Sequence, residues 1–156
     1  MFKSHLALGF FIGLIFISYF NVPYPVLFIL LVTVFSGLPD IDHPKSKYGR
    51  KLWFISIPIS WVSKHRGIFH SVYPPLLIFF VLSYFNYSYL GIAIAIGYIA
   101  HLIGDAVTKQ GINFLHPFST FEIRGPMTTG AFLETIVFFV IMGLNIFFTA
   151  RVIGLV

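Results

Sequence analysis

Long apolar stretches separated by short polar breaks dominate the chain. Residues 6–39 contain no charged residue and no histidine, and residues 71–100 form a second charge-free stretch. Each is longer than the roughly 20 residues that cross a bilayer once. Each also contains a break, at 21–25 with two prolines and at 86–88. The pattern therefore predicts two helical hairpins, with helices near 4–20 and 24–39, and near 68–85 and 88–107.

Two further apolar segments complete the predicted architecture. Residues 131–150 are long enough to span a membrane and are followed by Arg151. Residues 52–63 are too short to span and contain Pro58 and both tryptophans, which is typical of a helix in the membrane interface. We therefore expect an all-α integral membrane protein, a single domain over residues 1–156. It has about five transmembrane helices plus a short interfacial helix.

The composition agrees with a membrane-embedded chain. Apolar residues make up 58% of the sequence and charged residues 10%, against roughly 45–50% and about 25% in soluble domains. These values exclude a soluble globular domain, a disordered chain and a fibrous repeat. The chain has no cysteine, so disulfides, cysteine-based zinc sites and thiol nucleophiles are also excluded.

The basic residues predict the orientation. With five spans, the N-terminus and the loops 40–67 and 108–130 lie on one face of the membrane. That face carries Lys3, Lys45, Lys47, Arg50, Lys51, Lys64, Arg66, Lys109 and Arg124, whereas the other face carries Arg151. The positive-inside rule makes the first face, and the N-terminus, cytoplasmic. We expect a multi-pass protein of the inner (plasma) membrane, with its basic face against anionic lipid headgroups.

Histidines and carboxylates gather on this same face. Asp40 and Asp42 follow the second predicted helix, where a helix C-terminus disfavours negative charge unless a cation compensates it. His101 and Asp105 are four residues apart, so they share one helical face and could hold one divalent ion. The alternatives are a polar turn after the helix for the first pair, and a hydrogen bond between packed helices for the second.

Further candidates stand at other predicted helix ends. His65 and His70 begin the third predicted span, where a helix N-terminus favours the neutral, metal-binding imidazole. His5, His116 and Glu134 complete the set, although each taken alone could be structural. Imidazole nitrogens and carboxylate oxygens at one membrane depth predict a site for one to three divalent ions, Zn or Mn. Their position at helix ends favours chemistry at the headgroup layer over ion transport.

Several runs resemble a known family. They are Ser4-His5, Leu38-Pro39-Asp40-Ile41-Asp42-His43-Pro44, His65-Arg66-Gly67 with His70-Ser71, His101 to Asp105 with Thr108 and Gly111, and Leu115-His116-Pro117-Phe118. Together they resemble the membrane-bound metal-dependent hydrolases, the YdjM-like inner-membrane proteins. That family is distantly similar to the zinc-dependent phospholipases C and single-strand nucleases. The resemblance implies that the ligands are His5, one of Asp40 and Asp42, one of His65 and His70, His101 and a bridging Asp105, with His116 and Glu134 as the only further candidates.

These observations favour a membrane-bound metal-dependent hydrolase. The expected reaction is attack of metal-activated water on a phosphoester at the cytoplasmic face, with a lipid or lipid-linked phosphate as substrate. Asp40 or Asp42 would act as base, Asp105 would hold the metal, and Lys64 or Arg66 would stabilise phosphate charge. The alternative is a non-catalytic, metal-stabilised membrane protein or interaction partner. A metal transporter would need polar groups deeper in the spans, and the short basic loops do not predict nucleic-acid binding.

Overall fold

The computed structural model describes residues 1–63 and 66–155, and helices account for most of them. The elements in chain order are α1 (Phe2–Tyr19), α2 (Pro25–Phe35), η1 (Leu38–Asp42), α3 (Lys47–Lys51), α4 (Trp53–Val62), η2 (Ile68–His70), α5 (Tyr73–Tyr84), α6 (Ser88–Ala106) and α7 (Phe132–Val152). Between α6 and α7 the chain forms a loop with two isolated β-bridges, which join Thr108 to Met127 and Ile112 to Ile123.

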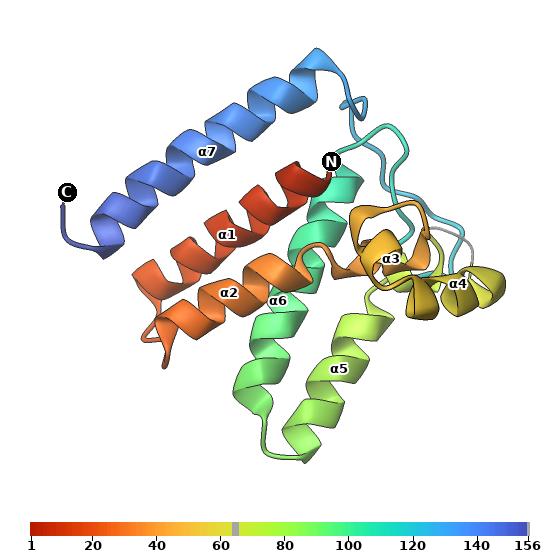
Figure 1. Cartoon of the computed structure of the whole chain (residues 1–156), viewed down its shortest axis with the longest axis horizontal. Coiled ribbons are helices and arrows are strands. Elements are labelled where there is room, and N and C mark those ends of the chain that lie inside the picture. The colour runs from red at the N-terminus through yellow and green to blue at the C-terminus, as the bar shows by residue number, and fades with distance from the viewer. Residues whose placement is uncertain (64–65, 156) are drawn as a thin grey trace.

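Two helical hairpins and a peripheral helix form the body of the molecule (Figure 1). Helix α1 packs against α2, α6 and α7, and α6 packs against α1, α2 and α5. Figure 1 shows α7 lying along α1, with α5 and α6 crossing below the first hairpin. The α2–α6 contact is close, because a Cβ added at Gly97 would collide with the carbonyl of Val32. The first part of the chain is thereby held against the middle of α6.

Four helical segments are long and apolar enough to cross a membrane: Phe2–Tyr19, Pro25–Asp42, Ser88–Ala106 and Phe132–Val152. Three correspond closely to the predicted spans at 4–20, 88–107 and 131–150. The predicted helix at 24–39 is an α-helix only to Phe35, and a 3-10 helix continues the path from Leu38. Pro39 in the first turn of η1 is compatible with the start of a helix and not with an uninterrupted one.

The third predicted span, near 68–85, differs most from the structure. Its helix α5 has 12 residues and is therefore short for a full crossing. Two prolines stand in its first turn, and a proline restricts the residue before it to non-helical conformations. At the other end, Asn86 adopts a positive φ of 64°, which stops the helix. Among the described residues, four helices are thus long and apolar enough to cross a membrane and α4 and α5 are shorter, so the number of spans stays a prediction.

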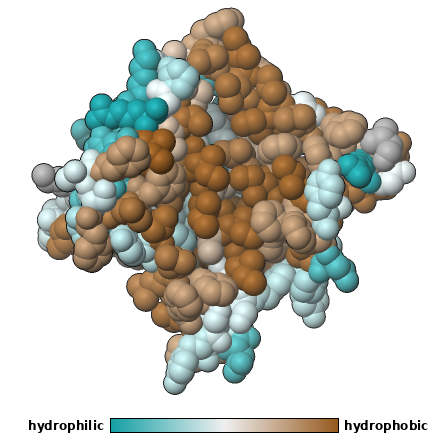
Figure 2. All heavy atoms as spheres, turned by 180° about the vertical axis from the view of Figure 1, so that it is seen from behind, coloured by the Kyte–Doolittle hydropathy of each residue, from teal (hydrophilic) through white to brown (hydrophobic). Residues whose placement is uncertain are grey.

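Apolar side chains cover much of the outside of the molecule. Only 11% of the most apolar window of α7 is buried inside the protein, and Phe139 on that helix is 66% exposed. Figure 2 shows apolar residues covering the middle of the face seen from behind, with the most hydrophilic residues towards its edges. Water would oppose such a surface, whereas lipid accepts it. The chain is a multi-pass membrane protein.

The short apolar segment predicted at 52–63 is helix α4, Trp53–Val62, with Pro58 inside it. Trp53 and Trp61 are 62% and 80% exposed. Tryptophan prefers the boundary between headgroups and hydrocarbon. The helix is thus confirmed, and its place in the interface stays a prediction.

Candidate metal centre

Three separate segments of the chain meet at one cluster of four titratable side chains. Asp40 comes from η1, His70 from the end of η2, and His101 and Asp105 from the last turns of α6. The i, i+4 spacing places the last two on one face of α6, as the sequence predicted. The hairpin of α1 and α2 brings η1 to the same end of α6 because α2 packs against that helix.

Four donor atoms of these residues face one another. The Nε2 atoms of His70 and His101 lie 3.3 Å apart. Asp105 Oδ2 lies 3.5 Å from His70 Nε2 and 3.7 Å from His101 Nε2. Asp40 Oδ1 lies 3.9 Å and 3.8 Å from the same two nitrogens. We call these four side chains, a candidate site for an ion, the metal centre.

Each histidine of the metal centre has its second ring nitrogen occupied. His101 Nδ1 lies 2.8 Å from the carbonyl oxygen of Ser36, and His70 Nδ1 lies 3.1 Å from Asp42 Oδ2. When Nδ1 donates a proton in this way, Nε2 of the neutral ring keeps its lone pair for a metal. Asp42 therefore supports a ligand, whereas Asp40 faces the centre directly.

The other oxygen of Asp105 lies close to His5 and Arg66. His5 Nε2 lies 3.4 Å from Asp105 Oδ1, and the His5 ring stacks on that of His101 with centroids 4.0 Å apart. Arg66 Nη2 donates to the same Oδ1 at 2.9 Å. The carboxylate of Asp105 thus joins the metal centre on one side to His5 and Arg66 on the other.

Arg66 is held in an unusual backbone conformation. Its φ is 62°, in the left-handed region that few residues other than glycine adopt. Its N–H donates to Asp42 Oδ2 at 3.2 Å, and its Nη1 donates to the Gly111 carbonyl at 2.9 Å. Strained backbone of this kind is common at functional sites. These bonds give Arg66 a role in orienting two carboxylates, in addition to the phosphate contact that the sequence predicted.

The metal centre is buried and rich in negative charge. His70 and His101 have no exposed surface and Asp105 is 2% exposed, while the side chain of Asp40 is 21% exposed. Burial lowers the pKa of His70, but its hydrogen bonds to Asp40 and Asp42 and the negative charges of Asp42 and Asp105 outweigh burial and raise that pKa to about 9. In the metal-free chain, a proton on His70 thus supplies positive charge that three carboxylates require. Asp40 provides the route to solvent.

This donor set fits a divalent ion. Bonds of about 2.0–2.1 Å in a tetrahedron would place donor atoms about 3.3–3.4 Å apart. The spacing between the two histidine nitrogens, and those from them to the two carboxylate oxygens, are 3.3–3.9 Å and require only a small contraction. Two carboxylates and two neutral imidazoles would also balance a charge of +2 better than a single proton does. On the Oδ1 side of Asp105, the Arg66 guanidinium occupies the place of a second cation. A second group of donor atoms, from His5, His101 and Asp105, also lies within 4.8 Å of one another, so the number of ions stays a prediction.

Not all predicted ligands join the cluster. Among the described residues, Glu134 and His116 are outside the two groups whose donor atoms lie within 4.8 Å of one another. Glu134 instead binds the Met1 amine and the Ser4 hydroxyl, each at 2.7 Å. His116 is half-buried in the loop between α6 and α7, where its N–H donates to Asn113. The predictions for His65 and Lys64 lie outside the described residues.

Sequence reasoning missed Ser36, which is completely buried between α1 and α6. Its carbonyl faces His101, and its hydroxyl donates to the His5 carbonyl at 2.9 Å. A small polar residue near the end of an apolar run was the only signal, because its role depends on segments far away in the sequence. Thr108 contributes in a similar way, with its hydroxyl 3.5 Å from Arg66 Nη1.

Comparison with known proteins relates the chain to a family of inner membrane proteins. The sequence model described as "YdjM inner membrane protein" matches residues 1–156. The chain is 40% identical to the uncharacterized protein YvsG of Bacillus subtilis over 116 residues, which is 72% of each chain. It is 37% identical to inner membrane protein YdjM of Escherichia coli over 92 residues, which is 51% of this chain and 44% of that protein. No solved structure matches.

Proposed function

The chain belongs to the YdjM inner membrane protein family, and for this member we propose a metal-dependent hydrolase whose substrate is a phosphoester of a lipid or lipid-linked phosphate. The observation that carries the proposal is the convergence of His70, His101, Asp40 and Asp105. Their donor atoms come from separate segments, and the histidine nitrogens lie 3.3–3.9 Å from one another and from the two carboxylate oxygens. Such buried, ionisable groups are expensive in a membrane protein and point to function.

The side chains of the site have different expected roles. A divalent ion held by the four donors would lower the pKa of water and polarise a phosphoryl oxygen. Asp40 is the partly exposed donor, so water and substrate would reach the ion from its side. Asp42 orients His70, and Arg66 orients Asp105 while its positive charge adds to the attraction for an anionic substrate.

The position of the centre supports a substrate from the membrane. His101 and Asp105 lie in the last turns of α6, and His5 in the first turns of α1. Both are helices long enough to cross a bilayer, so their ends lie near the headgroups. A phosphoester at that depth is most simply part of a lipid. By the distribution of basic residues, this face is the cytoplasmic one.

The first test measures metal content. Detergent-purified protein reloaded with Zn or Mn should contain about one ion per chain by elemental mass spectrometry. Asp105→Asn and His101→Ala should each remove it. Glu122→Gln is the matched control, because Glu122 is exposed and pairs only with Arg124 among the described residues. A wild-type protein that stays metal-free after reloading would overturn the proposal.

The second test measures hydrolysis. Metal-loaded protein in mixed micelles is incubated with phospholipids and with lipid phosphates, and phosphate and neutral lipid products are quantified. We expect product release that Asp40→Asn and Asp105→Asn abolish and Glu122→Gln preserves. Bound metal with no turnover in any lipid mixture would refute the enzyme and leave the metal centre intact.

One observation favours a second candidate, a structural metal that holds helix ends together. Structural zinc sites have four protein ligands, and catalytic ones usually have three and a water. The metal centre offers four donors, of which only Asp40 is appreciably exposed. Cobalt-substituted protein distinguishes the two. Inorganic phosphate should change its visible spectrum if a coordination position opens, and should leave it unchanged in a closed structural site.

A further inference from the structure

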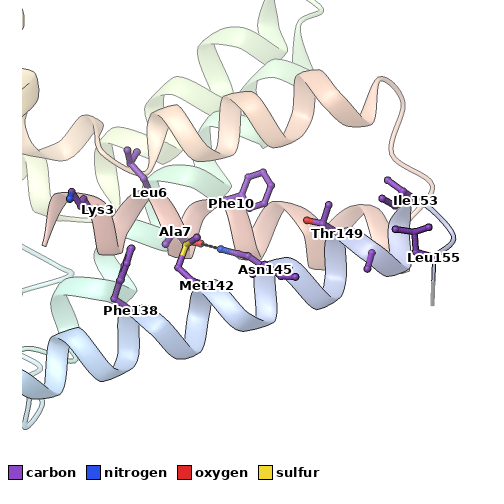
Figure 3. Close-up of a pocket in the computed structure, with 12 residues that line it drawn as sticks. Lys3, Leu6, Ala7, Phe10, Phe138, Met142, Asn145, Thr149, Ile153 and Leu155 are labelled. Atoms are coloured by element: carbon purple, nitrogen blue, oxygen red, sulfur yellow. Dashed lines mark hydrogen bonds between the residues drawn. The ribbon is translucent and has the colours of Figure 1, made fainter.

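A groove lies between α1 and α7, away from the metal centre. It has a volume of about 640 Å³, within the range of small-molecule binding sites. Its lining is apolar along most of its length, with Leu6, Phe10 and Met142 among the contributors. Figure 3 shows Met142 and Asn145 between the two helices, and Leu6 and Phe10 extending from the other side of α1 in that view.

The groove has a defined floor and a defined length. Asn145 is 4% exposed, and its Nδ2 donates to the Ala7 carbonyl at 3.1 Å, which ties α7 to α1 (Figure 3). From Phe138 to Ile153 the groove follows 15 residues of helix, or about 22 Å. One leaflet of the hydrocarbon core is about 15 Å deep. A whole acyl chain therefore fits along it.

One end of the groove is polar and basic. A second cavity, of about 360 Å³, shares Lys3 and Phe138 with the groove and is also lined by Lys47 and Ser4. Glu134 lines it too, but its carboxylate already binds the Met1 amine and the Gly130 N–H. The cavity thus presents two lysines beside a compensated carboxylate. A phosphate group is the natural complement of this arrangement.

We propose that the groove and the polar cavity together bind one anionic phospholipid, with an acyl chain along α1 and α7 and its phosphate against Lys3 and Lys47. The two compartments match the two halves of an amphiphile and are adjacent, because Lys3 and Phe138 line both. This lipid site is separate from the metal centre, so it stands whether or not the protein hydrolyses phosphoesters.

The test is lipid retention by native mass spectrometry of the detergent-purified chain. Phosphatidylglycerol or phosphatidylcholine is added in mixed micelles. We expect one tightly bound phosphatidylglycerol per chain and weaker binding of phosphatidylcholine. Asp105→Asn should bind lipid as the wild type does, which separates this site from the metal centre. Equal binding of the two lipids would overturn the anionic selectivity.

Two pairs of variants locate the lipid. Ala150→Phe fills the groove and should weaken binding about tenfold or more, whereas Val140→Phe, on the same helix but outside the groove, should not. Lys3→Gln should weaken phosphatidylglycerol binding roughly fivefold. Arg151→Gln also removes one positive charge, near Tyr19 at the other end of α1, and should leave phosphatidylglycerol binding unchanged. Equal effects within either pair, or a dimer of chains that Ala150→Phe dissociates, would overturn the proposal.

Discussion

At the scale of single residues, Asp40 and Asp42 have different neighbours and therefore different expected roles. Asp40 Oδ1 faces the Nε2 atoms of both histidines, whereas Asp42 Oδ2 is close to His70 Nδ1. We expect Asp42→Asn to lower metal affinity by about 10–100-fold while full occupancy is still reached at high metal, because it removes only the support of a ligand. Asp40→Asn should lower the number of ions bound per chain even at high metal concentration. Competition with a chromophoric chelator measures both, and the reverse ranking would exchange the two roles.

His70 carries a prediction about pH. Its pKa is raised from 6.5 to about 9 in the metal-free chain, because carboxylate hydrogen bonds outweigh burial. A pKa raised on folding stabilises the folded state fully below about pH 6.5, and that stabilisation is lost as the pH rises through about 9. The unfolding temperature of the metal-free protein should therefore fall across this window. Metal affinity should rise over the same window, since the ion displaces the proton.

The control for this pH dependence is His70→Gln, which should flatten both curves. His116→Gln should preserve them, because His116 is not part of the metal centre. A wild-type unfolding temperature that stays constant between pH 6.5 and 9 would contradict the assignment.

At the scale of the elements, the close approach of α6 to α2 depends on Gly97. An added Cβ would meet the Val32 backbone, which has no flexible end to move aside. Small residues at such contacts are what allow membrane helices to pack closely. Gly97→Ala should therefore destabilise the fold by about 1–3 kcal/mol. Gly143→Ala is the matched control, because a Cβ there meets nothing within 4 Å. Thermal unfolding in detergent measures both, and equal stability of the two variants would show that the contact is not tight.

Apolar length predicted the ends of some helices well and those of others poorly. The spans 88–107 and 131–150 match α6 and α7 to within two residues, because an uninterrupted apolar run of that length has few alternatives in lipid. The predicted span 68–85 was too long. Prolines in the first turn of α5 and the left-handed Asn86 set its ends, and local backbone chemistry of this kind outweighs apolar length.

At the scale of the whole molecule, the orientation in the membrane is testable directly. The chain has no cysteine. A thiol reagent can therefore label a variant only at the one cysteine that is introduced. By the positive-inside rule, Lys109→Cys should react with an impermeant thiol reagent only from the cytoplasm, and Asn86→Cys only from the opposite side. Labelling of intact cells and inverted membrane vesicles gives the answer. Labelling of both positions from one side would reject this topology and with it the cytoplasmic metal centre.

The sequence by itself determined that the chain is a helical membrane protein and which polar residues lie at the helix ends, since both follow from apolar length and residue type. It also singled out His101 with Asp105, because their spacing is a property of one helix. Tertiary contacts were needed to show that Asp40 faces the Nε2 atoms of both histidines while Asp42 lies at His70 Nδ1, and that Arg66 contacts Asp105. It likewise separated Glu134 and His116 from the centre and formed the groove beside α7. Those features depend on distances of a few ångströms between segments far apart in the chain, and no local pattern encodes them.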